Sequence, residues 1–189
     1  MTTRRQFLAR ASAAAAATLA APAIARAQAA MPDYLLPQYV RVSEGYAPGQ
    51  LMVLPRSHFL YWIDDQGRAL RYGVGVGKAG LDFQGSAVIQ VKKEWPTWRP
   101  TNEMIEREPQ TYAKFVDNDY VQPGGPGNPL GSRALYLFKD GRDTFYRIHG
   151  TTAPSSIGRS VSNGCIRMLN AHVEDLYERV PVGTKVTVL

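Results

Sequence analysis

One histidine and the only cysteine of the chain lie close together near its C-terminus, and they are the residues best suited to covalent chemistry. Fifteen residues separate His149 from Cys165. A thiol attacks a carbonyl group only as the thiolate, so it needs a base or a cationic neighbour, and histidine is the commonest such base. A single cysteine cannot form a disulfide within the chain. The alternative interpretation is that Cys165 is a small buried hydrophobic residue, and the count of cysteines leaves both interpretations open.

The residues around this pair are compatible with acyl transfer. Gly150 allows the backbone to turn sharply after His149, and we expect Gly164 to leave room for a substrate beside the sulfur. Backbone N–H groups near Cys165 are candidates for binding a developing oxyanion. Arg167 follows two residues later and lies on the same side as Cys165 if this stretch is extended, where its guanidinium can bind a substrate carboxylate.

The N-terminus has the pattern of an export signal. Arg4 and Arg5 are followed by Phe7 and Leu8 and then by a long alanine-rich run, which resembles a twin-arginine signal peptide. We expect cleavage after Ala27 and export to the periplasm. The alternative is an uncleaved amphipathic anchor.

Most of the positive charge belongs to this expected signal peptide. Removing residues 1–27 takes away four arginines and lowers the formal net charge from +6 to +2, so the charge does not indicate nucleic-acid binding. About 160 residues remain, enough for one domain with its own core. We expect a tether over 28–48 and a catalytic domain over 49–189.

The rest of the pattern is mainly β, with two short helices. Thr101 is expected to cap a short helix that ends at Arg107, and Asn170 to cap a helix over 171–180 with one apolar face. The segment 95–130 is rich in Pro and Gly and is long for a plain loop, which is typical of a functional lid. Turn signals at 64–67 and 140–141 predict two β-hairpins. The expected strands are 51–54, 59–63, 69–72, 88–92, 133–138, 144–148 and 184–189.

The C-terminal part resembles the active-site signature of the L,D-transpeptidases, the family with the YkuD-type catalytic domain. The resemblance covers roughly residues 50–189 and implies a β-sandwich with a short lid helix and one C-terminal helix. It is carried by His149-Gly150-Thr151, Ser156-Ile157-Gly158 and Ser162-x-Gly164-Cys165-Ile166-Arg167-Met168.

One position departs from the family pattern. The family often has histidine immediately before the Gly-Cys pair, and this chain has Asn163. Asparagine cannot accept a proton at neutral pH, so the role of general base is assigned to His149. Asn163 is then expected to orient a backbone carbonyl or the substrate. If the missing histidine were essential, the chain would be an inactive peptidoglycan-binding module.

The resemblance also implies a mechanism. Cys165 attacks the third residue of a peptidoglycan tetrapeptide stem, D-alanine leaves, and a thioester remains. An amine of a second stem then gives a 3→3 cross-link, water gives L,D-carboxypeptidase activity, and an amine of an envelope protein gives anchoring of that protein to the wall. His149 acts as base and then as acid, while Ser162, Asn163 and Arg167 shape the pocket.

No metal, organic cofactor or nucleic acid is implied, and a monomer is the default expectation. His58 and His172 lie apart in the sequence and form no metal-ligand pattern with Cys165. The rival cysteine enzymes fit less well. Papain-like peptidases usually place Cys before His, and sortases separate His and Cys by a much longer stretch.

Overall fold

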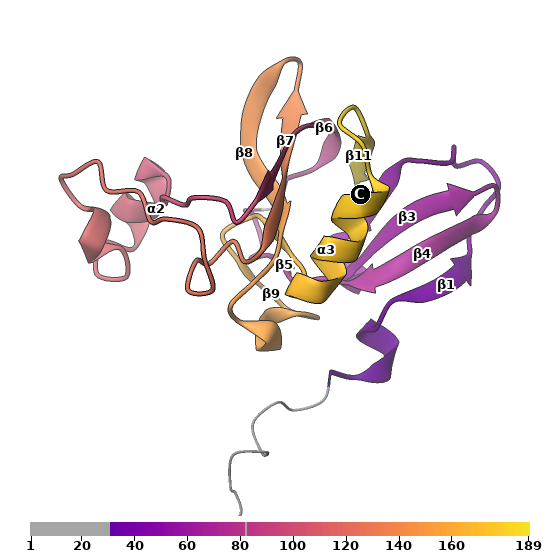
Figure 1. The fold of residues 1–189 in the computed structure, drawn as a ribbon, viewed down its shortest axis with the longest axis horizontal. Coiled ribbons are helices and arrows are strands. Elements are labelled where there is room, and N and C mark those ends of the chain that lie inside the picture. Colours follow the sequence, from indigo (N-terminus) through magenta and orange to yellow (C-terminus); the bar gives the residue numbers. More distant parts are fainter. Residues whose placement is uncertain (1–30, 82) are drawn as a thin grey trace, which may run out of the picture. The chain divides into compact units, whose positions relative to one another are not determined.

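The computed structural model of the protein describes residues 31–81 and 83–189, and the expected export signal over 1–27 lies outside them (Figure 1). Residues 33–189 form one unit, and strands make up most of its regular structure. The mainly β prediction is therefore confirmed. No helix of the described part is long and apolar enough to cross a membrane.

Among the described residues, nine strands form one mixed sheet, and two more form a small second sheet. The large sheet has the order β1-β4-β3-β2-β11-β6-β7-β8-β10, and β5 pairs with β9 in the second. Both predicted hairpins are present, as β3–β4 and β7–β8. The bounds are β1 Gln38–Arg41, β2 Leu51–Leu54, β3 Phe59–Asp65, β4 Arg68–Gly73, β5 Val76–Gly77, β6 Gly85–Glu94, β7 Arg133–Lys139, β8 Arg142–His149, β9 Ser160–Ser162, β10 Ile166–Arg167 and β11 Lys185–Val188.

Part of the expected tether belongs to the sheet. Strand β1 pairs antiparallel with β4 at the sheet edge, although its four residues are mostly exposed. The sequence of β1 does not predict a strand, because β1 has no apolar face. Backbone pairing with β4 holds it in the sheet. Just before it, Leu35 is buried and packs against Gly73, where a Cβ would lie 2.8 Å from the leucine Cβ.

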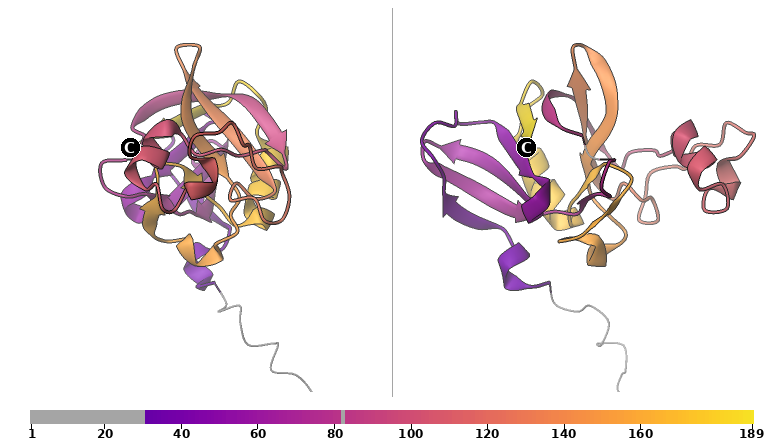
Figure 2. Two further views of the ribbon diagram at one scale, coloured as in Figure 1. Left: turned by 90° about the vertical axis from the view of Figure 1, so that its left-hand side faces the viewer. Right: turned by 180° about the vertical axis from the view of Figure 1, so that it is seen from behind.

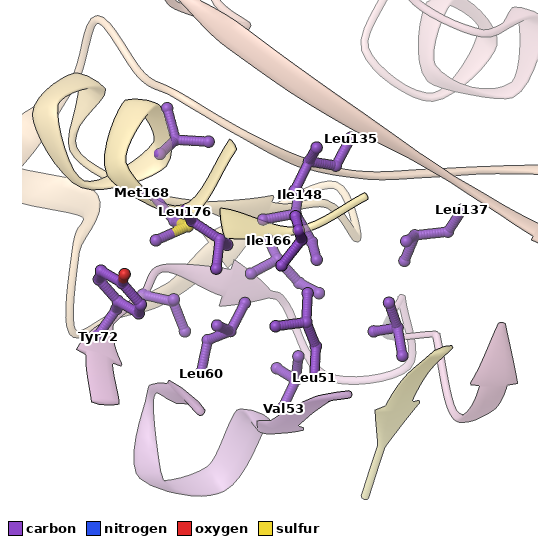
Figure 3. Close-up of a cluster of buried hydrophobic side chains, with 14 of the residues drawn as sticks. Leu51, Val53, Leu60, Tyr72, Leu135, Leu137, Ile148, Ile166, Met168 and Leu176 are labelled. Carbon is purple, nitrogen blue, oxygen red and sulfur yellow. The ribbon is translucent and has the colours of Figure 1, made fainter. Parts of the chain in front are cut away.

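One core joins both halves of the large sheet (Figure 3). Leu51 and Leu60 come from one half, Leu135 and Ile148 from the other, and all four are fully buried in the same cluster. Alternation along each strand sends every second side chain into this core. A core shared by the two halves is the packing expected of a sandwich.

Two α-helices lie within the described residues. Helix α2 spans Asn102–Arg107, and the Thr101 hydroxyl accepts a hydrogen bond from the Met104 N–H at 3.3 Å, which confirms the predicted cap. Helix α3 spans Asn170–Arg179 and packs on the core through Val173 and Leu176. The prediction that Asn170 caps α3 is wrong: Leu169 occupies the N-cap position without a side-chain hydrogen bond, and Asn170 is the first helical residue.

The segment 95–130 carries α2 and extends away from the strands as an excursion between β6 and β7 (Figures 1 and 2). It has a small aromatic cluster of its own. The ring of Trp98 lies 5.2 Å from Phe115 and 6.1 Å from Tyr112, and Phe115 lies 5.6 Å from Tyr120 (centroid distances). These contacts give the segment a defined shape without regular secondary structure over most of its length.

Candidate active site

Strand pairing brings the predicted histidine and cysteine to one face of the sheet. Strand β10 runs parallel to β8, with Arg167 opposite His149 and Ile166 opposite Ile148. The two isoleucines are buried in the core, so the alternate residues on either side of them face away from it. Those residues include Arg147 and His149 on β8, and Cys165 and Arg167 at β10.

These side chains line an open groove of about 920 Å³. The segment 95–130 supplies a large part of the lining, including Trp98, Met104, Tyr112 and Val121. The predicted lid therefore does border the reactive pair. The groove also takes in Ser162 and Asn163 from the turn before the cysteine.

His149 is buried, and one hydrogen bond sets the position of its proton. Its Nδ1 lies 2.5 Å from the carbonyl oxygen of Gly150. A carbonyl oxygen only accepts hydrogen bonds, so this contact favours the neutral tautomer with the proton on Nδ1 and the lone pair on Nε2. Burial lowers the pKa of His149 to about 4, although hydrogen bonds to the Gly150 and Leu130 carbonyls oppose this effect. The positive charges of Arg167 and Arg147 act in the same direction as burial. His149 is thus a neutral base at neutral pH.

Cys165 is half-buried, and its surroundings disfavour ionisation of the thiol. Burial raises the pKa of the thiol, and this outweighs the opposing effects of the Arg147 backbone N–H and of the charges on Arg147 and Arg167. The sulfur lies 3.9 Å from the carbonyl oxygen of Phe145. Burial thus favours the neutral form of both the thiol and the imidazole.

A bulge in β8 creates the surroundings of the sulfur. The register with β7 jumps from Tyr136 opposite Arg147 to Phe138 opposite Asp143, so β8 has two more residues than β7 in this interval. Phe145 within it has a left-handed φ of 61° and an exposed side chain. Two hydrogen bonds of 2.7 Å between Arg147 and Asp143 span the bulge. Alternation along β8 would have identified Arg147, but a bulge without glycine has no clear sequence signal.

The turn before Cys165 is braced by Ser162. Its hydroxyl donates to the Cys165 carbonyl at 2.6 Å and accepts from the Gly164 N–H at 3.1 Å. The space beside Gly164 is occupied by the protein itself: a Cβ there would lie 2.6 Å from both the Leu81 carbonyl and the Tyr146 ring. The expectation that Gly164 leaves room for substrate is therefore wrong, since this glycine is needed for packing.

Asn163 connects the cysteine turn to the segment 95–130. Its amide donates to the Tyr112 hydroxyl at 2.9 Å, and its oxygen accepts from the Arg107 guanidinium at 3.1 Å. The residue at the family's histidine position thus contacts the lid rather than a backbone carbonyl of its own turn.

Arg167 is fixed by its backbone while its side chain stays available. Its N–H and C=O pair with Gly75 at 2.8 and 2.9 Å. Gly75 must be glycine, because a Cβ would lie 2.5 Å from the Ser156 carbonyl. Within the described residues, the Arg167 guanidinium has no hydrogen-bond or ion-pair partner, and it lines the groove.

The other histidines lie outside the groove. The Nε2 of His58 is 3.0 Å from the Ser160 hydroxyl, and His172 packs near Tyr72. Over residues 31–81 and 83–189, no group of three His, Cys, Asp or Glu side chains is placed to bind a metal ion.

Comparison with known proteins agrees with this geometry. Residues 48–188 match the family model of the YkuD L,D-transpeptidase catalytic domain. The chain belongs to the L,D-transpeptidase family. The putative L,D-transpeptidase YkuD of Bacillus subtilis is 51% identical over 144 residues, which cover 76% of this chain and 77% of that protein.

A second L,D-transpeptidase relative is longer than this chain. The probable L,D-transpeptidase ErfK/SrfK of Escherichia coli is 35% identical over 157 residues, covering 82% of this chain. The matched region spans about half of that relative, 48% of its length.

A solved structure from Brucella melitensis, described as a probable carnitine operon oxidoreductase, is 52% identical and superimposes with a TM-score of 0.56. The match covers 85% of this chain and 96% of the other.

The glycines of the present chain at 73, 75 and 77 do not form a nucleotide-binding loop. Gly73 ends β4, Gly75 lies between the two strands and Gly77 ends β5. The segment that follows leads to β6 rather than to a helix.

Proposed function

We propose that the protein is a peptidoglycan L,D-transpeptidase that works through a thioester on Cys165. The observation that supports this most strongly is the contact between Nδ1 of His149 and the Gly150 carbonyl. With Nδ1–H bound to Gly150, Nε2 can take a proton from a nucleophile in the same groove.

In the acylation step, the Cys165 sulfur bonds to the carbonyl carbon of the third stem residue as its proton passes to Nε2 of His149. The amide C–N bond then breaks, and the imidazolium returns the proton to the leaving D-alanine nitrogen. Because both groups start neutral, proton transfer accompanies the attack, and no stored thiolate is required.

The oxyanion formed in this step needs an N–H donor. The Gly164 N–H is already bound to Ser162. The Cys165 N–H is the backbone donor on the proposed nucleophile itself. We assign the oxyanion to the Cys165 N–H.

Deacylation reverses the proton path. An amine of a second stem loses its proton to Nε2 and attacks the thioester carbon, so that a 3→3 cross-link forms and the thiol is restored. The guanidinium of Arg167 suits a carboxylate of the donor stem, because it lines the groove without a protein partner. Water or an amine of an envelope protein are the alternative acceptors.

We place this activity in the periplasm. The support is the paired Arg4 and Arg5 followed by the alanine-rich run, with cleavage after Ala27. Stem peptides of the wall lie in that compartment.

The proposed function is tested by incubating the full chain with purified disaccharide-tetrapeptide and analysing the products by mass spectrometry, with Cys165→Ala as control. We expect dimers joined 3→3 and released D-alanine, both absent in the control. Tripeptide without dimers would assign the enzyme to L,D-carboxypeptidases. An unchanged substrate with measurable binding would identify a binding module and overturn the proposal.

A further inference from the structure

Asn170 lies next to the histidine loop and makes an unusual pair of contacts. Although it is the first residue of α3, its side chain does not cap the helix. Its Oδ1 accepts hydrogen bonds from the Thr151 N–H at 3.1 Å and from the Ser132 N–H at 3.3 Å. One side-chain oxygen therefore joins the start of α3 to the loop after β8 and to the start of β7.

The two glycines beside the Asn170 side chain, Gly131 and Gly150, leave no space for a residue with a Cβ. A Cβ on Gly131 or on Gly150 would lie 2.2 Å from the Asn170 Oδ1. Gly131 also has a left-handed φ of 66°. Glycine is required at both positions for the asparagine to reach the backbone.

The Thr151 N–H and the Gly150 C=O belong to the same peptide group. In a trans peptide these two bonds point in opposite directions within one plane. With its N–H held by Asn170, the peptide directs its C=O toward the Nδ1 of His149, which lies 2.5 Å away. Asn170 thus binds the N–H of the Gly150–Thr151 peptide group, and His149 binds its C=O.

From this arrangement we infer that Asn170 is a positioning residue, which fixes the orientation and tautomer of His149 through the Gly150–Thr151 peptide. The inference rests on the proposed role of His149 as the base. Without the Oδ1 acceptor the peptide is free to rotate, Nδ1–H loses its acceptor, and Nε2 no longer stays unprotonated and aimed at the nucleophile.

Two variants and one control test this role in the full chain. Asn170→Ala removes the acceptor, whereas Asn170→Asp keeps an oxygen of the same reach at a helix N-terminus, where a carboxylate is tolerated. Tyr72→Phe is the matched control, because it removes the 2.5 Å hydrogen bond from Tyr72 to Asp175 on the same helix without touching the loop. Thermal unfolding identifies any variant that fails to fold.

The first readout is the tautomer of His149, taken from imidazole ¹⁵N chemical shifts, and it needs no substrate. We expect the Nδ1–H form in the unmodified protein, in Asn170→Asp and in Tyr72→Phe, and a mixture of tautomers in Asn170→Ala. Retention of the pure Nδ1–H form in folded Asn170→Ala would overturn the inference, whether or not the protein is a transpeptidase.

The second readout is the rate of Cys165 acylation by a carbapenem. We expect Asn170→Ala to slow it by roughly 10- to 100-fold, a part of what general-base catalysis contributes, and Asn170→Asp to restore most of the rate. The carboxylate is also expected to raise the pKa of His149 and to move the acid limb of the pH profile upward. Equal loss in both variants, or a loss in Tyr72→Phe of the same size, would contradict a positioning role.

Discussion

At the residue scale, burial and two arginines set the pKa shifts of the two proposed catalytic residues, His149 and Cys165. Burial lowers the pKa of His149 and raises that of Cys165, and the positive charges of Arg147 and Arg167 add to the first effect while opposing the second. For both groups burial is the largest cause, so each favours its neutral form.

This state predicts the pH dependence of simple alkylation. Because the thiol pKa lies above its usual value of 9.0, little thiolate is present at neutral pH. We expect the rate of iodoacetamide labelling of Cys165 to rise about tenfold per unit between about pH 6 and pH 8. Intact-mass spectrometry of quenched samples measures this rate. A plateau across that range would reveal a thiolate–imidazolium pair and contradict the neutral one.

The sequence predicted that His149 and Cys165 share one site, but not all of the residues that support them. His149 and Cys165 are identifiable because their types and spacing are rare together. Asn170 was not recognised, since asparagine before an apolar helical pattern is equally typical of an N-cap. Only the tertiary structure shows that its oxygen reaches across to the Gly150–Thr151 peptide instead.

At the element scale, the segment 95–130 is held beside the cysteine by few contacts. Asn163 binds Tyr112 and Arg107, and Lys78 lies 3.6 Å from Glu108 in a partly exposed ion pair that contributes little. Asn163 is therefore the side chain that joins this segment to the turn before Cys165.

Replacing that amide is expected to loosen the lid. In Asn163→Ala two hydrogen bonds of about 1 kcal/mol each are lost, so we expect faster limited proteolysis within 95–130 and a KM for stem peptide raised roughly three- to tenfold. Gln90→Ala, which alters an exposed amide on β6, is the control. Proteolysis and KM like those of the control would show that Asn163 does not hold the segment.

The sequence predicted the β-hairpins better than it predicted the β8 bulge and the edge strand β1. The hairpins followed from the turn residues at 64–67 and 140–141 and from alternating apolar residues. The β8 bulge and edge strand β1 depend on backbone geometry and pairing, which leave no apolar pattern.

At the scale of the whole molecule, one core supports both the sheet and the helix that carries Asn170. Leu176 on α3 is fully buried in the same cluster as Ile148 of β8, one residue before His149. Packing of α3 and placement of the site are therefore coupled.

We expect Leu176→Ala to lower the free energy of unfolding by about 2–5 kcal/mol. The variant loses buried apolar surface and leaves a cavity that its neighbours fill only in part, and the two costs add. Chemical denaturation measures the change. Val182→Ala, at an exposed position, is the control and is expected to stay within about 0.5 kcal/mol. A Leu176→Ala protein as stable as the control would show that α3 is not held by this core.

The most direct test of the central claim is intact-mass spectrometry of the full chain after incubation with a carbapenem, whose strained carbonyl is an acyl donor for a thiol. We predict one adduct per chain, none in Cys165→Ala, and formation slowed roughly 100-fold or more in His149→Gln. A folded protein that forms no adduct, or an adduct that persists in Cys165→Ala, would contradict the assignment of Cys165 as an acylable nucleophile activated by His149.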